Sequence, residues 1–280
     1  MTLIITSQNG TSFNFRDMGI RVLNFEPESL NTNHTIESVS GGSYVVSDSY
    51  IVERYIDVEL QFLAADIGDY VLLRRELFNL LAGTQWFYVV DEREPNKRWQ
   101  VFPNDQFQTE REGLKGIVSL RWLCRNKYAE SVYTAQEIIT LGDGVDTKKV
   151  WDPGLFAWDG STDWEETLNY NFNTNQFDVQ NLGTAPVDPR TDFLDIEVRG
   201  NFGPFFEILS LTNRSVYRVD LTATPTDRIF LTGVQSFKND TSIFLPSNKR
   251  VIVLEPGNND FIITGGTVES VRFNFRYLYK

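Results

Sequence analysis

The stretch Ile56-Asp57-Val58-Glu59-Leu60-Gln61-Phe62 indicates the fold class of this 280-residue chain. Its apolar residues occupy every second position, and the positions between them are charged or polar. Successive side chains of a β-strand point to opposite faces, so this alternation predicts a strand with one face on a core and one in water. Val118, Leu120 and Trp122 alternate with polar residues in the same way. We therefore expect a mainly β fold.

Directly after this strand the pattern becomes helical, and we expect one helix over residues 66–82. Asp66 can cap its first turn. At about 100° per residue the apolar residues of this segment cover an arc of roughly 180°, which is wider than one packing face needs. Two interpretations stay open. Either the helix packs deeply into its own domain, or part of the arc, around Val71, Arg74 and Phe78, contacts another subunit.

The second half of the chain contains many short strands separated by turns rich in Pro, Gly, Asn and Asp. Such a series is typical of an antiparallel β-sandwich. Aromatic residues within these strands, such as Phe206, Phe273 and Phe275, fall on the alternating face that we expect to fill the core.

The composition changes near residue 140, which predicts a boundary between two domains, residues 1–140 and 169–280. The predicted connector, residues 141–168, is rich in Gly, Asp, Asn and Thr. Between Val150 and Pro189 the chain has no Lys or Arg but seven carboxylates. The connector also carries three Trp that could stack on a sugar, anchor a protein partner or fill the seam between the domains, namely Trp151, Trp158 and Trp164.

The chain is acidic, with 26 Lys and Arg against 38 Asp and Glu and a formal net charge of −12. Proteins that bind nucleic acid through its phosphates carry clustered Lys and Arg, so we expect no sequence-specific nucleic-acid binding. The longest apolar run, Trp86 to Val90, is far shorter than the roughly 20 residues that span a bilayer, so we expect no membrane insertion. The first residues also lack the features of a signal peptide, which predicts a protein made in the cytoplasm and not exported.

One His and one Cys leave little room for catalytic or metal chemistry. His34 lies in a polar stretch with no nucleophile signature nearby, and His34 and Cys124 alone cannot form a Cys/His zinc cluster. The carboxylates Asp163, Glu165 and Glu166 lie together in the connector, where acidic clusters are usually solvated surface. No glycine-rich phosphate-binding motif is present. We expect no catalytic residue, no metal and no cofactor, and therefore an assembly or binding role rather than an enzyme.

Six short segments follow one another in an order that characterises a known family. They are Phe15–Ile20, Tyr55–Phe62, the helical pattern Leu73–Leu81, Phe177–Thr184, Leu194–Gly200 and Leu254–Asn259. In this order and over this length, the chain resembles the distal tail protein family of long-tailed phages of Gram-positive hosts. The acidic, Trp-bearing connector departs from the pattern of that family.

The resemblance implies an N-terminal, ring-forming β domain with one helix and a galectin-like C-terminal sandwich. It implies a homo-hexamer at the virion tail tip that joins the tail tube protein to the tail-associated hub protein, with DNA passing through the central opening. Receptor-binding proteins would dock on the outer domains, which we expect to bind free sugars weakly or not at all. One competing interpretation is a carbohydrate-binding module or accessory protein that recognises host cell-wall sugar. Another is a capsid or tail-fibre component of a different kind.

Overall fold

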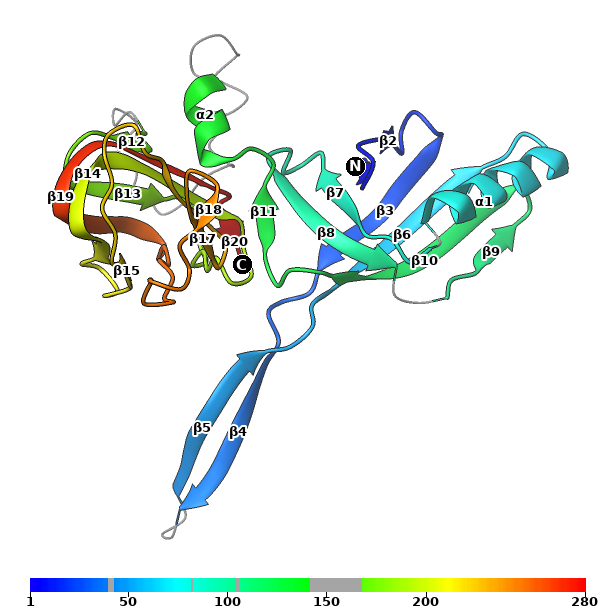
Figure 1. Cartoon of the computed structure of the whole chain (residues 1–280). Coiled ribbons are helices and arrows are strands. Elements are labelled where there is room, and N and C mark those ends of the chain that lie inside the picture. The colour runs from blue at the N-terminus through cyan, green and yellow to red at the C-terminus, as the bar shows by residue number, and fades with distance from the viewer. Residues whose placement is uncertain (40–42, 82, 104–105, 142–167) are drawn as a thin grey trace. The chain divides into compact units, whose positions relative to one another are not determined.

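The computed structural model describes residues 1–39, 43–81, 83–103, 106–141 and 168–280 (Figure 1). These residues divide into two compact units, Met1–Ala129 with Lys280, and Glu130–Tyr279. Both are built mainly of antiparallel strands, so the predicted mainly β fold is confirmed. None of the helices in the described ranges has the length and apolar character needed to cross a membrane.

The first unit is an antiparallel sheet that carries one helix and a separate hairpin. Its elements are β1 (Leu3–Ser7), β2 (Ser12–Asn14), β3 (Ile20–Pro27), β4 (Thr32–Val39), β5 (Ser43–Ile51), β6 (Tyr55–Leu63), α1 (Ile67–Leu81), β7 (Phe87–Asp91), β8 (Lys97–Pro103), β9 (Thr109–Glu112) and β10 (Lys115–Cys124). The strands follow the order β2-β1-β7-β8-β10-β6-β3, and β9 pairs with β10. β4 and β5 form a two-stranded sheet of their own. β11 (Ala129–Ser131) begins at the boundary between the units.

The alternating stretch of the sequence forms β6, and all four of its apolar residues are buried. β10 pairs with β6 so that Trp122 lies opposite Ile56 and Gly116 lies opposite Phe62. A Cβ atom on Gly116 would lie 2.3 Å from Cζ of Phe62, so the glycine makes room for this ring. Gly116 lies within β10. The chain turns just before this strand, at Gly113, whose φ is +64°.

The second unit has a sandwich-like β architecture with one short helix. Its elements are α2 (Ala135–Leu141), β12 (Asn171–Phe172), β13 (Gln176–Asn181), β14 (Leu194–Ser210), β15 (Val216–Val219), β16 (Ile229–Thr232), β17 (Gln235–Lys238), β18 (Thr241–Ser242), β19 (Gly257–Phe275) and β20 (Leu278–Tyr279). The main strand order is β12-β19-β14-β16-β17-β18, with β13 on β19 and β15 on β14. Phe206, Phe273 and Phe275 are fully buried, as predicted.

β14 and β19 are two long strands, whereas the sequence predicted only short strands separated by turns. They pair along most of their length, with register shifts between Arg199 and Gly200 and between Phe202 and Glu207. A Cβ atom on Gly266 would lie 1.9 Å from the carbonyl oxygen of Asn201, so the backbones approach closely there. Glycines that resemble turns in the sequence thus allow bends and bulges within continuous strands.

The boundary between the units lies at Ala129, earlier than the predicted boundary near residue 140. The reason is that β11 and α2 are bonded to the second unit. Nε2 of Gln136 on α2 donates to the carbonyl oxygen of Phe273 at 2.7 Å. The backbone N of Ser131 on β11 donates to the carbonyl oxygen of Tyr277 at 2.9 Å. The predicted connector, residues 141–168, falls within the sequence range of the second unit, and residues 142–167 of it lie outside the described residues.

The sequence analysis missed α2, although a capping box signals its start. The backbone N of Thr134 donates to Oε2 of Glu137 at 2.7 Å, and the backbone N of Glu137 donates to Oγ1 of Thr134 at 3.3 Å. This Thr-x-x-Glu pattern marks the first turn of many helices. The helix is only seven residues long, which leaves little apolar periodicity to detect.

Candidate functional site: assembly surfaces

The helix α1 starts where the sequence predicted, because two acidic side chains accept hydrogen bonds from backbone N atoms in and just before its first turn. Oδ1 of Asp66 accepts a hydrogen bond from the backbone N of Asp69 at 2.8 Å. Oδ2 of Asp69 accepts one from the backbone N of Ala65 at 2.7 Å. Carboxylates in these positions also interact favourably with the helix dipole.

This helix is buried over a narrower face than its apolar arc predicted. Only Tyr70, Leu77 and Leu81 are buried, and the ring of Tyr70 lies 5.3 Å from that of Phe62 in β6. Deep packing of the whole arc into the domain is therefore wrong. The remaining apolar side chains of α1 stay at least partly in contact with solvent.

The predicted interface candidates lie on one stripe along the flank of α1. Ile67, Val71, Arg74 and Phe78 are spaced by four, three and four residues, which places them on one side of a helix. Ile67 is 62% exposed, Val71 is 37% exposed and Arg74 is exposed. Phe78 is half-buried, because its ring packs edge-on against Phe107 with 5.0 Å between ring centres. We call these four residues the helix stripe.

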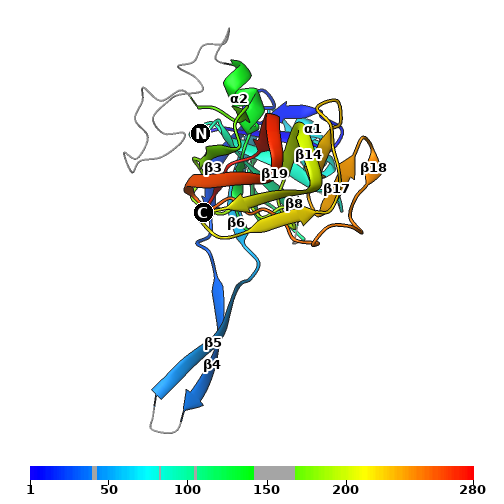
Figure 2. The ribbon, with the colours of Figure 1, turned by 60° about the vertical axis from the view of Figure 1, so that its left-hand side comes forward.

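The hairpin of β4 and β5, which we call the arm (Thr32–Ile51), is the most exposed element of the first unit (Figures 1 and 2). Every side chain from Thr32 to Ser38 and from Tyr44 to Tyr50 is exposed. The exposed set includes five large apolar residues, namely Ile36, Tyr44, Val45, Val46 and Tyr50. The arm thus offers apolar surface that its own subunit does not bury.

The arm contains His34, which the sequence analysis placed in a short polar stretch. His34 lies on β4 opposite Ser49, and its Nδ1 is 2.7 Å from Oγ of Ser49. This contact is an ordinary cross-strand hydrogen bond and gives His34 a structural partner. The sequence signal for the arm is Gly41-Gly42 between two segments rich in Thr, Val, Ile and Tyr, which is a typical hairpin pattern.

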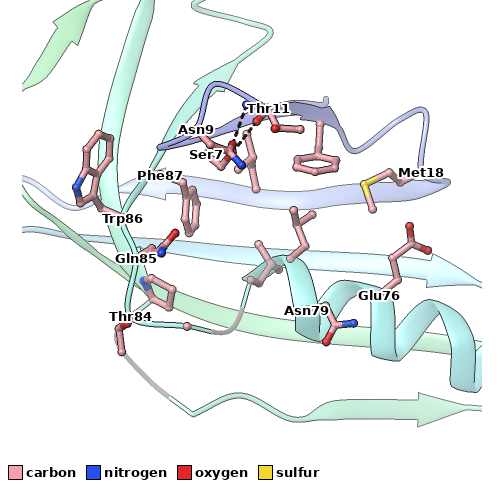
Figure 3. Close-up of a pocket in the computed structure, with 16 residues that line it drawn as sticks. Ser7, Asn9, Thr11, Met18, Glu76, Asn79, Thr84, Gln85, Trp86 and Phe87 are labelled. Atoms are coloured by element: carbon pink, nitrogen blue, oxygen red, sulfur yellow. Dashed lines mark hydrogen bonds between the residues drawn. The ribbon is translucent and has the colours of Figure 1, made fainter.

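A groove of about 610 Å³ lies between α1 and the β1–β2 hairpin (Figure 3). Its apolar lining includes Ile5, Phe13, Met18, Leu80, Trp86 and Phe87. Its polar lining includes Ser7, Asn9, Thr11, Glu76, Asn79 and Gln85. Glu76 is the only ionisable side chain among the lining residues. The groove therefore has the character of a contact surface and lacks the paired groups of a catalytic site.

Cys124 lies in the core of the first unit, at the end of β10. Burial raises the pKa of its thiol to about 12, so the thiol stays protonated at neutral pH. A protonated, buried thiol is a poor nucleophile and a poor metal ligand. Within the described ranges, no group of three or more His, Cys, Asp or Glu is placed to hold a metal ion.

The remaining predicted candidates, Trp151, Trp158 and Trp164, lie outside the described residues, as do Asp163, Glu165 and Glu166.

The second unit does carry two aromatic residues off its core face, which the sequence analysis missed. Phe230 and Phe237 are paired across β16 and β17 and are half-buried. The guanidinium of Arg228 lies 4.3 Å from the centre of the Phe230 ring and occupies a face on which a sugar would stack.

Comparison with protein families identifies the first unit. Residues 8–120 match the family model of the phage tail protein RIFT-related domain. The first unit is therefore similar to this phage tail domain, and we call it the tail domain. The matched range contains the arm, the helix stripe and most of the residues that line the groove. No curated protein matches the sequence.

The fold of the entire chain, tail domain and second unit together, is that of a known tail protein. The crystal structure of the SPP1 Dit protein (gp 19.1), described as a paradigm of the hub adsorption apparatus in phages that infect Gram-positive bacteria, matches with a TM-score of 0.68. The match covers 99% of this chain and 100% of that one at 13% sequence identity, which shows a shared fold. The predicted resemblance to distal tail proteins is thus confirmed in the fold.

Two weaker similarities are to chains of the phage P2 baseplate in its activated conformation, with Ca and with Sr. Their TM-scores are 0.43 and 0.42, at 11% and 13% identity. They cover 99% and 98% of this chain and 97% of each of the others. Scores this low carry no argument about this protein.

Proposed function

We propose that this protein is a distal tail protein that forms a six-membered ring at the tip of a phage tail. The tail domain forms the ring, which joins the tail tube protein to the tail-associated hub protein. The second unit presents surface for other tail-tip proteins, including receptor-binding proteins. The tail-domain match and the whole-chain fold likeness support this proposal.

The observation that carries the proposal is the exposed arm. An isolated two-stranded hairpin is at best marginally stable in water, because it buries too little apolar surface. The arm nevertheless exposes Tyr44 to 76% and four further apolar side chains to at least half of their surface. Such a hairpin gains its stability when it packs on another surface, and in a tail that surface is another protein subunit.

Closed rings of more than two copies need two different contact surfaces on each subunit. The tail domain has such surfaces: the arm protrudes, whereas the groove is hollow and the helix stripe exposes Ile67, Val71 and Arg74. We propose that the arm of one copy packs on the tail domain of its neighbour. This head-to-tail arrangement uses unlike surfaces and closes on itself.

The net charge of −12 is compatible with a ring through which DNA passes. A lumen of negative charge repels phosphates and lets the nucleic acid slide without binding. Arg228 covers one face of the Phe230 ring, which disfavours sugar stacking at that ring.

Electron microscopy of the purified full-length protein tests the ring directly. We expect closed rings with six-fold symmetry. The matched variant lacks only the arm. Because the backbone N of Val52 donates to the carbonyl oxygen of Asn31 at 3.0 Å, residues 32–51 can be replaced by an Asn-Gly turn that joins two hydrogen-bonded residues.

The arm-less variant should remain folded and monomeric, with an unchanged melting temperature of the tail domain. Ser47→Ala, a change of an exposed polar side chain on the same arm, should still form rings. A monomeric wild-type protein at high concentration, or rings of equal stability without the arm, would contradict the proposal.

A further inference from the structure

The second unit carries a small apolar tip that no fold requirement explains. Leu245 is 85% exposed, more than any other large apolar side chain in the described residues, and its neighbour Phe244 is 41% exposed. Both lie in a turn that follows β18. Single exposed apolar residues are common on soluble proteins, but adjacent ones on a fixed turn are typical of a contact surface.

The turn is held firmly in place. Both the backbone N and Oγ of Ser247 donate to the carbonyl oxygen of Phe244, at 3.2 and 2.7 Å. The backbone N of Asn248 donates to the carbonyl oxygen of Arg218 at 2.8 Å. Nδ2 of Asn248 donates to the carbonyl oxygen of Val216 at 3.0 Å. These bonds tie the turn to β15, so little conformational entropy is lost when a partner covers Leu245.

Positive charge borders the apolar tip. Nζ of Lys249 lies 5.8 Å from the centre of the Phe244 ring, and Arg250 follows directly. Neither cation has an ion-pair partner among the described residues, and the segment from Thr241 to Arg250 contains no carboxylate. Arg250 also lines a hollow together with Val234, which is 55% exposed. We call Val234, Phe244, Leu245, Lys249 and Arg250 the basic tip.

We propose that the basic tip docks a second tail protein, one whose contact face has an apolar pocket bordered by carboxylates. This inference rests on the proposed function and adds a site and a partner chemistry to it. Leu245 would fill the pocket, and Lys249 and Arg250 would face the carboxylates. In a protein of net charge −12, two cations beside the exposed Leu245 favour an acidic partner and orient it.

Two other occupants fit the observations less well. An anionic membrane would be repelled by the overall charge of the protein, and two cations give little binding to its surface. A saccharide needs several fixed polar groups around an aromatic platform, whereas the most exposed residue of the tip is a leucine.

Photo-crosslinking in assembled particles tests the proposal. A photoreactive phenylalanine analogue is introduced at Leu245 in the phage, tails are purified, and adducts are identified by mass spectrometry. We expect one adduct with a different virion protein, at a peptide that contains Asp or Glu. The double variant Lys249→Glu and Arg250→Glu should lower the adduct yield about tenfold or more, since it places negative charges opposite the carboxylates of the partner. The same analogue at Thr226, an exposed residue on another turn, is the control.

Adducts only with lipid, with saccharide or with copies of this same chain would overturn the inference, as would no adduct in tails that contain the protein. Equal yields with and without the two charge changes would do the same. If the protein is absent from purified tails, the proposed function fails as well. The two failures are therefore distinguishable.

Discussion

The helix stripe gives the sharpest test of which face of the tail domain contacts a neighbouring copy. The perturbation is the double variant Ile67→Ser and Val71→Ser. Their exposed fractions, 62% and 37%, together correspond to roughly one fully exposed side chain. Burying such a side chain contributes about 1.5–3 kcal/mol. If the stripe is buried between subunits, each contact should therefore weaken by about 2 kcal/mol, or about 30-fold in its dissociation constant.

The fraction of assembled rings is measured by mass photometry over a dilution series. Leu72→Ser is the matched control, because Leu72 is 63% exposed but lies about 100° further round the helix than Val71. Circular dichroism should show equal helix content in all variants. Assembly of the double variant at wild-type concentrations, or an equal loss for Leu72→Ser, would refute the stripe as an interface.

The structure also sorts the two other candidates on the stripe. Arg74 is exposed, so Arg74→Glu perturbs a contact with a neighbour without disturbing the core. Phe78 packs edge-on against Phe107, so Phe78→Asp would place a charge beside a half-buried ring. A loss of rings in the Phe78 variant would then mix assembly with folding. Arg74→Glu is therefore the better of these two tests.

Three further predictions concern folding. Gly116→Ala should destabilise the tail domain by about 1–3 kcal/mol in urea denaturation, because its Cβ would overlap the buried Phe62 ring; unchanged stability would show that β6 and β10 can separate freely. A fragment of residues 130–280 should melt at a higher temperature than one of residues 169–280, because only the longer fragment keeps the hydrogen bonds of α2 and β11; equal melting would contradict the boundary at Ala129. Cys124 should react with an aromatic disulfide reagent only after denaturation, and reaction in the native protein would show that the core opens.

The sequence was most informative where one chain buries its own apolar residues. β6 was predicted because Ile56, Val58, Leu60 and Phe62 all face the same core and their polar neighbours face away. The helix α1 was predicted from its cap and its periodicity, but its depth of burial was not. Periodicity states which side of a helix is apolar, whereas the width of the buried face depends on how many strands lie beneath it.

Long bent strands were harder to predict for a local reason. The stretch around Gly265 and Gly266 has the composition of a turn, yet β19 continues through it. Gly266 is needed because the backbone of β14 approaches within the space of a side chain. A glycine required by a close backbone approach and a glycine required by a turn cannot be distinguished in a single sequence.

The arm shows why a surface made for assembly escapes an analysis that looks for a core. Its register places Tyr44 and Val46 on one face and Val45 on the other, so apolar side chains occur on both sides of the hairpin. A strand whose burial comes from its own chain alternates, because one face is dry and one is wet. The arm has no buried face within its subunit. Its exposed apolar side chains would be unfavourable in water without a partner. The absence of alternation combined with high β-propensity is thus itself a signal, and the proposal that the arm packs on another copy of the chain accounts for it.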